Sequence, residues 1–442
     1  MSDSAIVRAL PGRLDLGAQL GYGVGQIAGQ VFRDVPSLLL LFFLTTVLGI
    51  APAVAGAAIF VPKLVFGVGC DLAVGVLSDR WRHRVARRWW LLAGAAGAPL
   101  AMILLFHVPD GSTTLRVAYV AVAFSLYMAV YACFSVPYLA ISGELTSNPQ
   151  TRTVLMAWRL VFTAVGVLVA SAVAPAIVQA RGGGQPGYEA MALVLAVICP
   201  TAILLTFLTI SRRSLAPPPA AQRRLSLRQG VAALRKPRFA VLCGVNVMQL
   251  MGSGMGYASL LYFLSYNMGR SDALEVIGGV VLAACVGIVV AQPMWVAIAA
   301  RLGKRRGYVL GSIVYSASYI VWALSAAADV KFAYLLSFLA AIGNSGWAML
   351  GFSMIADIAG DNAAHGSLYS AAWVASDKIG FALGGTLLVG LILSGFGFDS
   401  ARAVRGLPQG HLALVGVMFA FGFVPAALNL SGAAILAKWG RD

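Results

Sequence analysis

The sequence predicts an all-α membrane protein with twelve transmembrane helices in two six-helix bundles and both termini in the cytoplasm. Three observations predict this fold. Of the 442 residues, 60% are hydrophobic and 11% are charged, whereas a soluble domain has about 25% charged residues. Apolar runs recur along the chain at about 20 residues each, the length of a membrane-spanning helix. Most of the 32 lysines and arginines fall in alternate loops, as the positive-inside rule expects.

The apolar runs define the elements in order. The first is long and contains Pro36, which predicts a tilt or a kink. We expect the first bundle in residues 1–211, a basic linker in 212–238 and the second bundle in 239–442. The twelve predicted spans are roughly 18–48, 52–78, 88–108, 114–141, 154–179, 188–211, 239–268, 273–299, 307–327, 332–357, 367–396 and 410–437.

The basic loops orient these spans. Residues 80–88, 212–238 and 301–306 are rich in arginine and lysine, which places them and both termini in the cytoplasm. The net charge of +16 is thereby explained by topology, so we expect no nucleic-acid partner. The linker ends in a basic stretch with apolar residues at helical spacing. We interpret it as a linker at the membrane surface; a lipid-binding regulatory helix is the alternative.

No pattern in the sequence indicates an enzyme or a metal site. The five cysteines fall in apolar spans without CxxC spacing, and the four histidines are scattered in loops and at span ends. No phosphate-binding glycine loop, GxSxG or HExxH motif occurs. We therefore predict no enzymatic activity, no cofactor and no bound metal, and we expect a monomer whose partners are the bilayer and a small molecule.

Charged side chains inside the spans are the main functional signal. A charge at bilayer depth costs at least ~2.5 kcal/mol on insertion scales, so it normally has a partner or a function. Such charges predict a polar interior, although fixed ion pairs that orient helices are the alternative for each. The seven embedded charges are Arg33, Asp34, Lys63, Asp71, Arg159, Asp377 and Lys378.

Helical spacing places several of these charges relative to one another. Arg33 and Asp34 are about 100° apart on a helix, so one should face a cavity and the other a neighbouring helix. Lys63 and Asp71 share a face but are ~12 Å apart along the axis, so each needs another partner. We predict Asp34 as the partner of Lys63. We expect Asp71 to be a lone carboxylate that takes up a proton, because burial favours the neutral acid.

Polar and aromatic stripes add candidate substrate contacts. Gln30 lies on a polar stripe of the first span, and Tyr131 and Ser135 lie on one face of the fourth. Trp373 and Asp377 share a face of the eleventh. Aromatic faces can stack on a sugar ring; ordinary helix packing is the alternative.

The stretch GVLSDRWRHR (75–84) follows the second span. Its Gly75, Asp79, Arg80 and Arg84 resemble the signature of the major facilitator superfamily in the loop between helices 2 and 3. In that family two six-helix halves enclose a substrate site near the midplane. The resemblance implies a cytoplasmic gate in which Asp79 pairs with a neighbouring arginine.

Further stretches resemble the glycoside–pentoside–hexuronide:cation symporters, the family of the melibiose permease. These are GYGVGQIAGQVFRDVPSLLLLFFLTTVLGI (21–50), DLAVG (71–75), SVPYLAISGELTSNPQTRT (135–153), LLYFLSYNMG (260–269), MIADIAGD (354–361) and DKIGFALGG (377–385).

The resemblance implies ion and substrate roles for particular residues. Asp71, Arg159 and Lys378 match charged positions of the family, whereas its other acidic positions fall here on Gly67, Ser135 and Gln30. Asp34 lies one turn beyond Gln30. A hard cation prefers several oxygen ligands, so the missing carboxylates favour H⁺ over Na⁺ as the coupling ion.

We therefore predict a secondary active transporter of the bacterial inner membrane. It would couple H⁺, or less favourably Na⁺, at Asp71 and Asp34 to symport of a sugar, a glycoside or a hexuronide-like solute. The embedded charges sum to +1, which suits an acidic solute. The alternatives are a carrier of lysolipids, organic anions or drugs with the same fold, or a non-transporting receptor or assembly factor. The predicted substrate contacts are Gln30, Arg33, Lys63, Tyr131, Ser135, Arg159, Trp373, Asp377 and Lys378.

Overall fold

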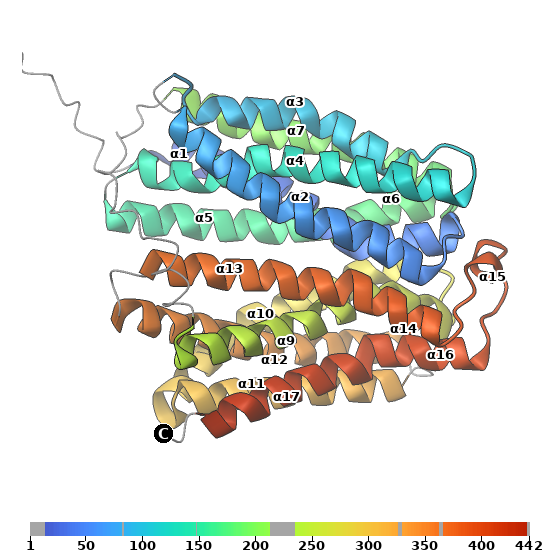
Figure 1. Ribbon diagram of the computed structural model, residues 1–442. Coiled ribbons are helices and arrows are strands. Elements are labelled where there is room, and N and C mark those ends of the chain that lie inside the picture. Colours follow the sequence, from blue (N-terminus) through green and yellow to red (C-terminus); the bar gives the residue numbers. More distant parts are fainter. Residues whose placement is uncertain are drawn as a thin grey trace, which may run out of the picture.

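The computed structural model is an all-helical protein in which twelve helices are long and apolar enough to cross a membrane. It describes residues 14–81, 84–146, 148–212, 235–325, 329–361 and 366–439. The twelve predicted spans are confirmed, and their ends agree within a few residues. The helices lie side by side in two bundles, with α1 to α7 in one and α9 to α17 in the other (Figure 1). Residues 213–234 of the predicted linker lie outside the described part.

The first bundle is built from six spans, two of which are interrupted by short π-helical segments. A π segment is a widened turn that is frequent at functional positions. The elements are α1 (Leu16–Val35), η1 (Pro36–Leu40), η2 (Phe43–Val47), α2 (Pro52–Arg80), α3 (Arg88–Phe106), α4 (Thr113–Leu145), α5 (Pro149–Leu168), η3 (Val169–Val173), α6 (Ala174–Ala180) and α7 (Gln185–Ser211).

The second bundle repeats this plan, and three of its spans contain a π segment. Its elements are α9 (Pro237–Tyr262), η4 (Phe263–Asn267), α10 (Ala273–Leu302), α11 (Lys304–Leu324), α12 (Val330–Asp361), α13 (Gly366–Ala382), η6 (Leu383–Leu388), α14 (Val389–Gly395), α15 (Ser400–Val404), α16 (His411–Met418), η7 (Phe419–Phe423) and α17 (Val424–Trp439).

The first span lies at the centre of the molecule. It packs against α5 and α7 of its own bundle, and its η1 segment packs against α9 of the other. The predicted irregularity at Pro36 takes the form of a π segment that begins at this residue. Proline has no N–H to donate to the preceding turn, so the regular α-helical bonding stops there.

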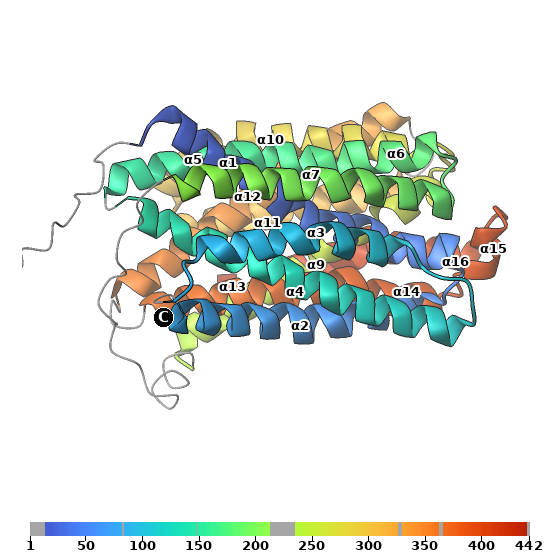
Figure 2. The ribbon, with the colours of Figure 1, turned by 90° about the horizontal axis from the view of Figure 1, so that it is seen from above.

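The two ends of the bundles differ. We call the end where α1 begins and α17 finishes the terminal face, and the end that contains α15 the opposite face; Figure 2 shows both from above. The bundles make hydrogen bonds to each other at the opposite face. Thr45 and Tyr262 share a hydroxyl hydrogen bond of 2.5 Å, and Ser400 donates to the carbonyl oxygen of Ile50 at 2.9 Å. These bonds join the bundles at this end.

Backbone packing reinforces this closure. Gly56 of α2 lies so close to the second bundle that a Cβ there would be 2.6 Å from the carbonyl oxygen of Thr386. Nearby, the backbone N–H of Ala53 donates to Ser394 Oγ at 2.9 Å. The α2 and η6 segments thus leave no room for a side chain at this contact, because a real Cβ does not approach an oxygen so closely.

We expect Gly56→Val to lower the thermal stability of the purified protein and to loosen the opposite face. Overpacking of a tight contact costs about 1–3 kcal/mol, and here the added methyl groups push α2 away from the second bundle. Thermal unfolding and maleimide labelling of a cysteine placed at Ser400 would measure both effects. Gly69→Val is the matched control, because nothing lies within 4 Å of a Cβ there. Equal stability of the two variants would contradict the packing argument.

Candidate functional site

An ion pair joins the two bundles at bilayer depth. Lys378 of α13 donates to the Asp71 carboxylate of α2. The Asp71 side chain is 17% exposed and the Lys378 side chain 46%. The expectation that Asp71 is a lone carboxylate is therefore wrong, because the sequence could not show that a lysine more than 300 residues away would reach it. The pair connects two elements that must separate if the bundles move apart.

Arg33 and Asp34 form a second ion pair, within α1. Arg33 Nε lies 2.9 Å from Asp34 Oδ1, and Gln30 Nε2 donates to Asp34 Oδ2 at 2.6 Å. The Asp34 side chain is 5% exposed, whereas that of Arg33 is 61% exposed. The two side chains do point to different surroundings, as helix geometry predicts. The long arginine side chain nevertheless folds back far enough to reach its neighbour.

The exposure of Arg33 locates a cavity. Within residues 18–50, all of which are described, Arg33 alone is exposed. The first span is central and packs against both bundles, so this exposure faces space between the bundles and not lipid. The guanidinium therefore lies in an inter-bundle cavity that water can enter.

Lys63 has no carboxylate partner among the described residues. Its Nζ donates to Ser37 Oγ at 3.1 Å and lies 5.4 Å from the ring centre of Phe381, on α13. Among the described residues no carboxylate lies within ion-pair distance of it. The predicted direct pair with Asp34 is wrong, because Arg33 and Gln30 already occupy that carboxylate. Asp34 still attracts Lys63 and Arg33 repels it at longer range.

Asp377 enters the cavity region from the second bundle. Its Oδ1 accepts a 2.5 Å hydrogen bond from Asn246 Nδ2 of α9, and the same amide donates to Ser376 Oγ at 2.9 Å. Arg33 attracts Asp377 across the interface at longer range. Asp377 stands out in the sequence as an embedded charge, but only the fold shows that Asn246 meets it.

Arg159 reaches inward from α5. Its Nε donates to Gln26 Oε1 of α1 at 2.8 Å, and its guanidinium lies 5.9 Å from the ring centre of Tyr138. Since both contacts are within the first bundle, Arg159 fixes α5 against α1 and α4.

The uncharged candidates divide between the cavity region and the core. Tyr131 is partly buried and stacks on Phe32 with ring centres 5.5 Å apart, and Ser135 is also partly buried on the same helix. Trp373 is 2% exposed and packs on Phe352. In this conformation Trp373 therefore belongs to the core of the second bundle and does not reach the cavity.

The predicted gate lies at the terminal face. Gly75 lies within α2, and Arg80 and Arg84 are exposed; the Asp79 side chain lies outside what the structure describes. The ion pair found here joins Arg87, before α3, to Glu144 near the end of α4. The latch through Asp79 thus stays a prediction, and the Arg87–Glu144 pair was missed because the sequence only showed both residues near helix ends.

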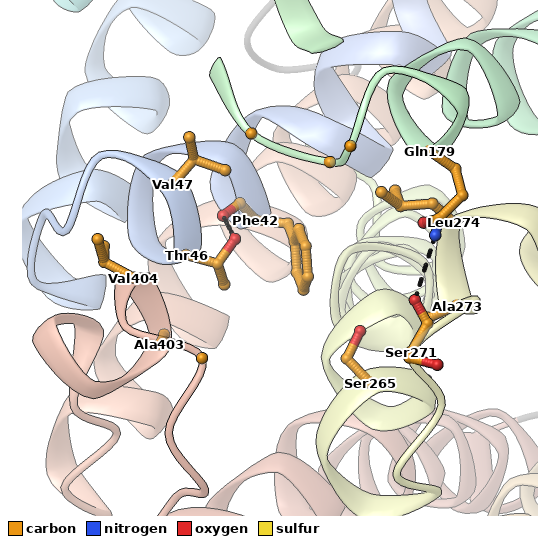
Figure 3. A pocket seen from close by; sticks show the side chains of 14 residues that line it. Phe42, Thr46, Val47, Gln179, Ser265, Ser271, Ala273, Leu274, Ala403 and Val404 are labelled. Carbon is orange, nitrogen blue, oxygen red and sulfur yellow. Dashed lines mark hydrogen bonds between the residues drawn. The ribbon is translucent and has the colours of Figure 1, made fainter. Parts of the chain in front are cut away.

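A separate pocket of about 470 Å³ lies at the opposite face between the bundles (Figure 3). At one side of it Gln179 donates to the backbone carbonyl of Ser271 at 3.4 Å. None of the predicted site residues lines it, and no charged side chain does so among the described residues. Its lining includes Phe42, Thr46, Gln179, Ser265, Ser271 and Val404.

Two six-helix bundles with charges gathered between them define a membrane protein of the major facilitator fold. The chain belongs to the family described as MFS/sugar transport protein, whose model matches residues 21–438. This is a membrane transport family and not an enzyme family. Together with the twelve spans, it makes the chain a multi-pass integral protein of the bacterial inner membrane.

Relatives with described roles are similar along much of the chain. The inner membrane symporter YicJ of Escherichia coli is 25% identical over 59% of this chain, and the match spans only 56% of that protein. The isoprimeverose transporter of Lactiplantibacillus pentosus is 25% identical over 89% of this chain and 84% of its own length. A putative sulfoquinovose importer of Salmonella typhimurium is 26% identical over 92% of this chain and 85% of its own length.

Solved structures support the same fold. The crystal structure of the nucleoside transporter NupG matches with a TM-score of 0.66 and 13% identity, over 96% of this chain and 99% of that one. A bacterial homolog of the human lysosomal transporter Spinster, in an inward-facing and unoccupied conformation, matches with a TM-score of 0.68 and 14% identity, over 95% and 94%.

The ion pair between the bundles predicts non-additive mutations. Asp71→Asn should lower the melting temperature because it leaves Lys378 without its partner. Lys378→Gln should also lower it, because it leaves Asp71 without its partner. The double variant should lose less stability than the sum of the losses in the two single variants, because contacting residues commonly couple by about 0.5–3 kcal/mol. Thermal unfolding of the four proteins tests this. Strict additivity would show that the pair is not formed in solution.

Proposed function

We propose that the protein is a cation-coupled symporter that moves a sugar-like solute by alternating access between its two bundles. Membership of a sugar transport family and the similarity to a symporter and an isoprimeverose transporter support this solute class. The observation that carries the proposal is the Asp71–Lys378 ion pair between the bundles. It lies where an ion could control their separation.

The terminal face is the cytoplasmic one in this proposal. The loops at that face contain the arginine-rich segment around Arg84 and the linker, as the positive-inside rule requires. Since the hydrogen bonds at Thr45 and Ser400 join the bundles at the opposite face, the conformation described is closed to the outside. The cavity at Arg33 would then open toward the cytoplasm.

The coupling ion in this proposal is H⁺, bound at Asp71. Protonation removes the negative charge of Asp71 and with it the attraction for Lys378, so the bundles can separate there. Na⁺ is the weaker candidate, because it prefers several oxygen ligands. Two positions that are acidic in the family are occupied here by Gly67 and Ser135. Asp34 would assist by holding Arg33 in place.

The solute in this proposal has an acidic group. Among the described residues the Lys63 ammonium interacts closely with a hydroxyl and an aromatic ring, and the bond of Arg33 to Asp34 uses Nε. Among the described residues the two terminal nitrogens of Arg33 make no hydrogen bond, so they can bind a carboxylate or sulfonate in the two-pronged geometry that arginine favours. Gln30, Tyr131 and Arg159 would contact the remainder of the solute.

We expect purified protein in proteoliposomes to take up protons when glucuronate is added, with methyl glucoside as the matched neutral solute. A proton gradient should drive glucuronate accumulation, and a Na⁺ gradient alone should not. Na⁺-driven uptake would replace H⁺ by Na⁺ as the coupling ion. Failure of glucuronate, methyl glucoside and isoprimeverose to move under either gradient would contradict sugar symport and favour a carrier of other solutes or a receptor.

Asp71→Asn should abolish proton-driven accumulation while leaving downhill exchange of glucuronate. The asparagine cannot bind or release a proton and no longer holds Lys378, so the bundles can move without an ion. Accumulation and exchange are measured in the same vesicles. Asp110→Asn, on an exposed loop, is the control that should behave as the unchanged protein. Intact accumulation in Asp71→Asn would remove this residue from the coupling step.

Lys63→Met should weaken glucuronate binding at least about tenfold and leave methyl glucoside binding nearly unchanged. A hydrogen bond to a charged group contributes about 1.5–3 kcal/mol, and 1.4 kcal/mol corresponds to about tenfold in affinity. Thermal shift or calorimetric titration provides the affinities. Lys331→Met is the control, since this lysine is exposed at the opposite face. Equal losses for both solutes would contradict an acid-specific contact.

A further inference from the structure

The three embedded carboxylates differ in their partners. Asp34 is paired with Arg33 and Asp71 is paired with Lys378. Asp377 accepts a hydrogen bond from the neutral amide of Asn246, and among the described residues no cation lies within ion-pair distance of it. It is therefore the embedded acid whose negative charge has the least direct compensation.

We propose that Asp377 is a second proton-binding site, in the second bundle, whose protonation promotes binding of the solute's acidic group through Arg33. The coupling to the solute rests on the proposed function, whereas the proton site itself does not. The geometry that carries it is a carboxylate of α13 that is bound to the neutral Asn246 amide and has no cation within ion-pair distance among the described residues.

The other charged groups near Asp377 are bound to other partners or lie at the ends of their helices. From α9 come the Asn246 amide and the Cys243 thiol, which interacts with Ser376. From α2, Lys63 is bound to Ser37 and Asp71 to Lys378, which is also the neighbour of Asp377 in the chain. From α12, Asp357 is bound to Lys304 at the terminal face and Lys331 lies at the other end of the helix. Arg33 of α1 completes the set.

Protonation fits the local geometry. Oδ1 of Asp377 accepts from Asn246, while among the described residues Oδ2 has no hydrogen-bond partner. A proton can therefore bind Oδ2 without breaking the existing bond. The proton is taken from cavity water as the solution becomes more acidic.

Arg33 transmits the effect to the solute. It attracts Asp377 in the second bundle while its exposed guanidinium faces the cavity. When Asp377 is neutral, one anion fewer competes for Arg33. The attraction between Arg33 and a solute carboxylate therefore becomes stronger. By thermodynamic reciprocity, a bound solute anion must then raise the affinity of Asp377 for its proton.

Infrared difference spectroscopy of the purified protein, titrated with acid and without solute, tests the proton site directly. The carbonyl stretch of a neutral carboxylic acid should appear in Asp71→Asn, where the coupling carboxylate can no longer contribute, and its amplitude should be lower in the double variant Asp71→Asn/Asp377→Asn. Asparagine has the shape of the protonated acid, so the variant should fold. A band of equal amplitude in Asp71→Asn and in the double variant, or no band in Asp71→Asn throughout the titration, would overturn the proposal.

Binding of glucuronate at a series of pH values tests the coupling. In the unchanged protein the logarithm of the association constant should fall by up to about one per pH unit as the solution becomes alkaline, the slope for one linked proton. In Asp377→Asn the association constant should depend less on pH and should stay high in alkaline solution. An equal slope in both proteins would overturn the coupling. If the infrared band behaves as expected but no sugar acid is bound, the proton site stands and the proposed solute fails.

Discussion

The charge balance between the bundles is the constraint on which the rest of the structure depends. A charge that is removed from water without a partner costs several kcal/mol, so each embedded charge limits how the bundles can sit. The Asp71–Lys378 pair joins α2 to α13, and Lys63 of α2 lies over Phe381 of α13. Moving the bundles apart therefore changes the electrostatic energy of α2 directly. An ion or an acidic solute that replaces one of these contacts can control that movement.

The opposite face shows a different kind of contact, which is uncharged and depends on close backbone approach. The π segments of the first, fifth, seventh and eleventh spans all lie in the half of the molecule toward this face, and several of them contact the other bundle. There Thr45 meets Tyr262, and Gly56 meets the backbone at Thr386. Contacts of this kind can break and re-form with little desolvation of charge, which suits a face that opens and closes in each cycle.

The sequence predicted the fold well because apolar run length and loop charge are local properties that each span displays independently. It also identified the seven embedded charges discussed above, since these stand out in apolar surroundings. It could not predict partners. Asp71 and Lys378 are far apart in the chain, and Arg33 reaches Asp34 only because its side chain folds back. Helical spacing likewise placed Trp373 on a polar face, but spacing cannot distinguish a face toward a cavity from a face toward a neighbouring helix.

The distribution of unpaired charge argues for a direction of coupling. Lys63 belongs to the first bundle and Asp377 to the second, and each lacks an oppositely charged partner within ion-pair distance among the described residues. Arg33 repels Lys63 and attracts Asp377 at longer range. An anion bound near Lys63 and a proton bound to Asp377 would each neutralise one of these charges. Together they would leave the cavity with less uncompensated charge than either alone, so the doubly loaded state is the one that can close with the least penalty.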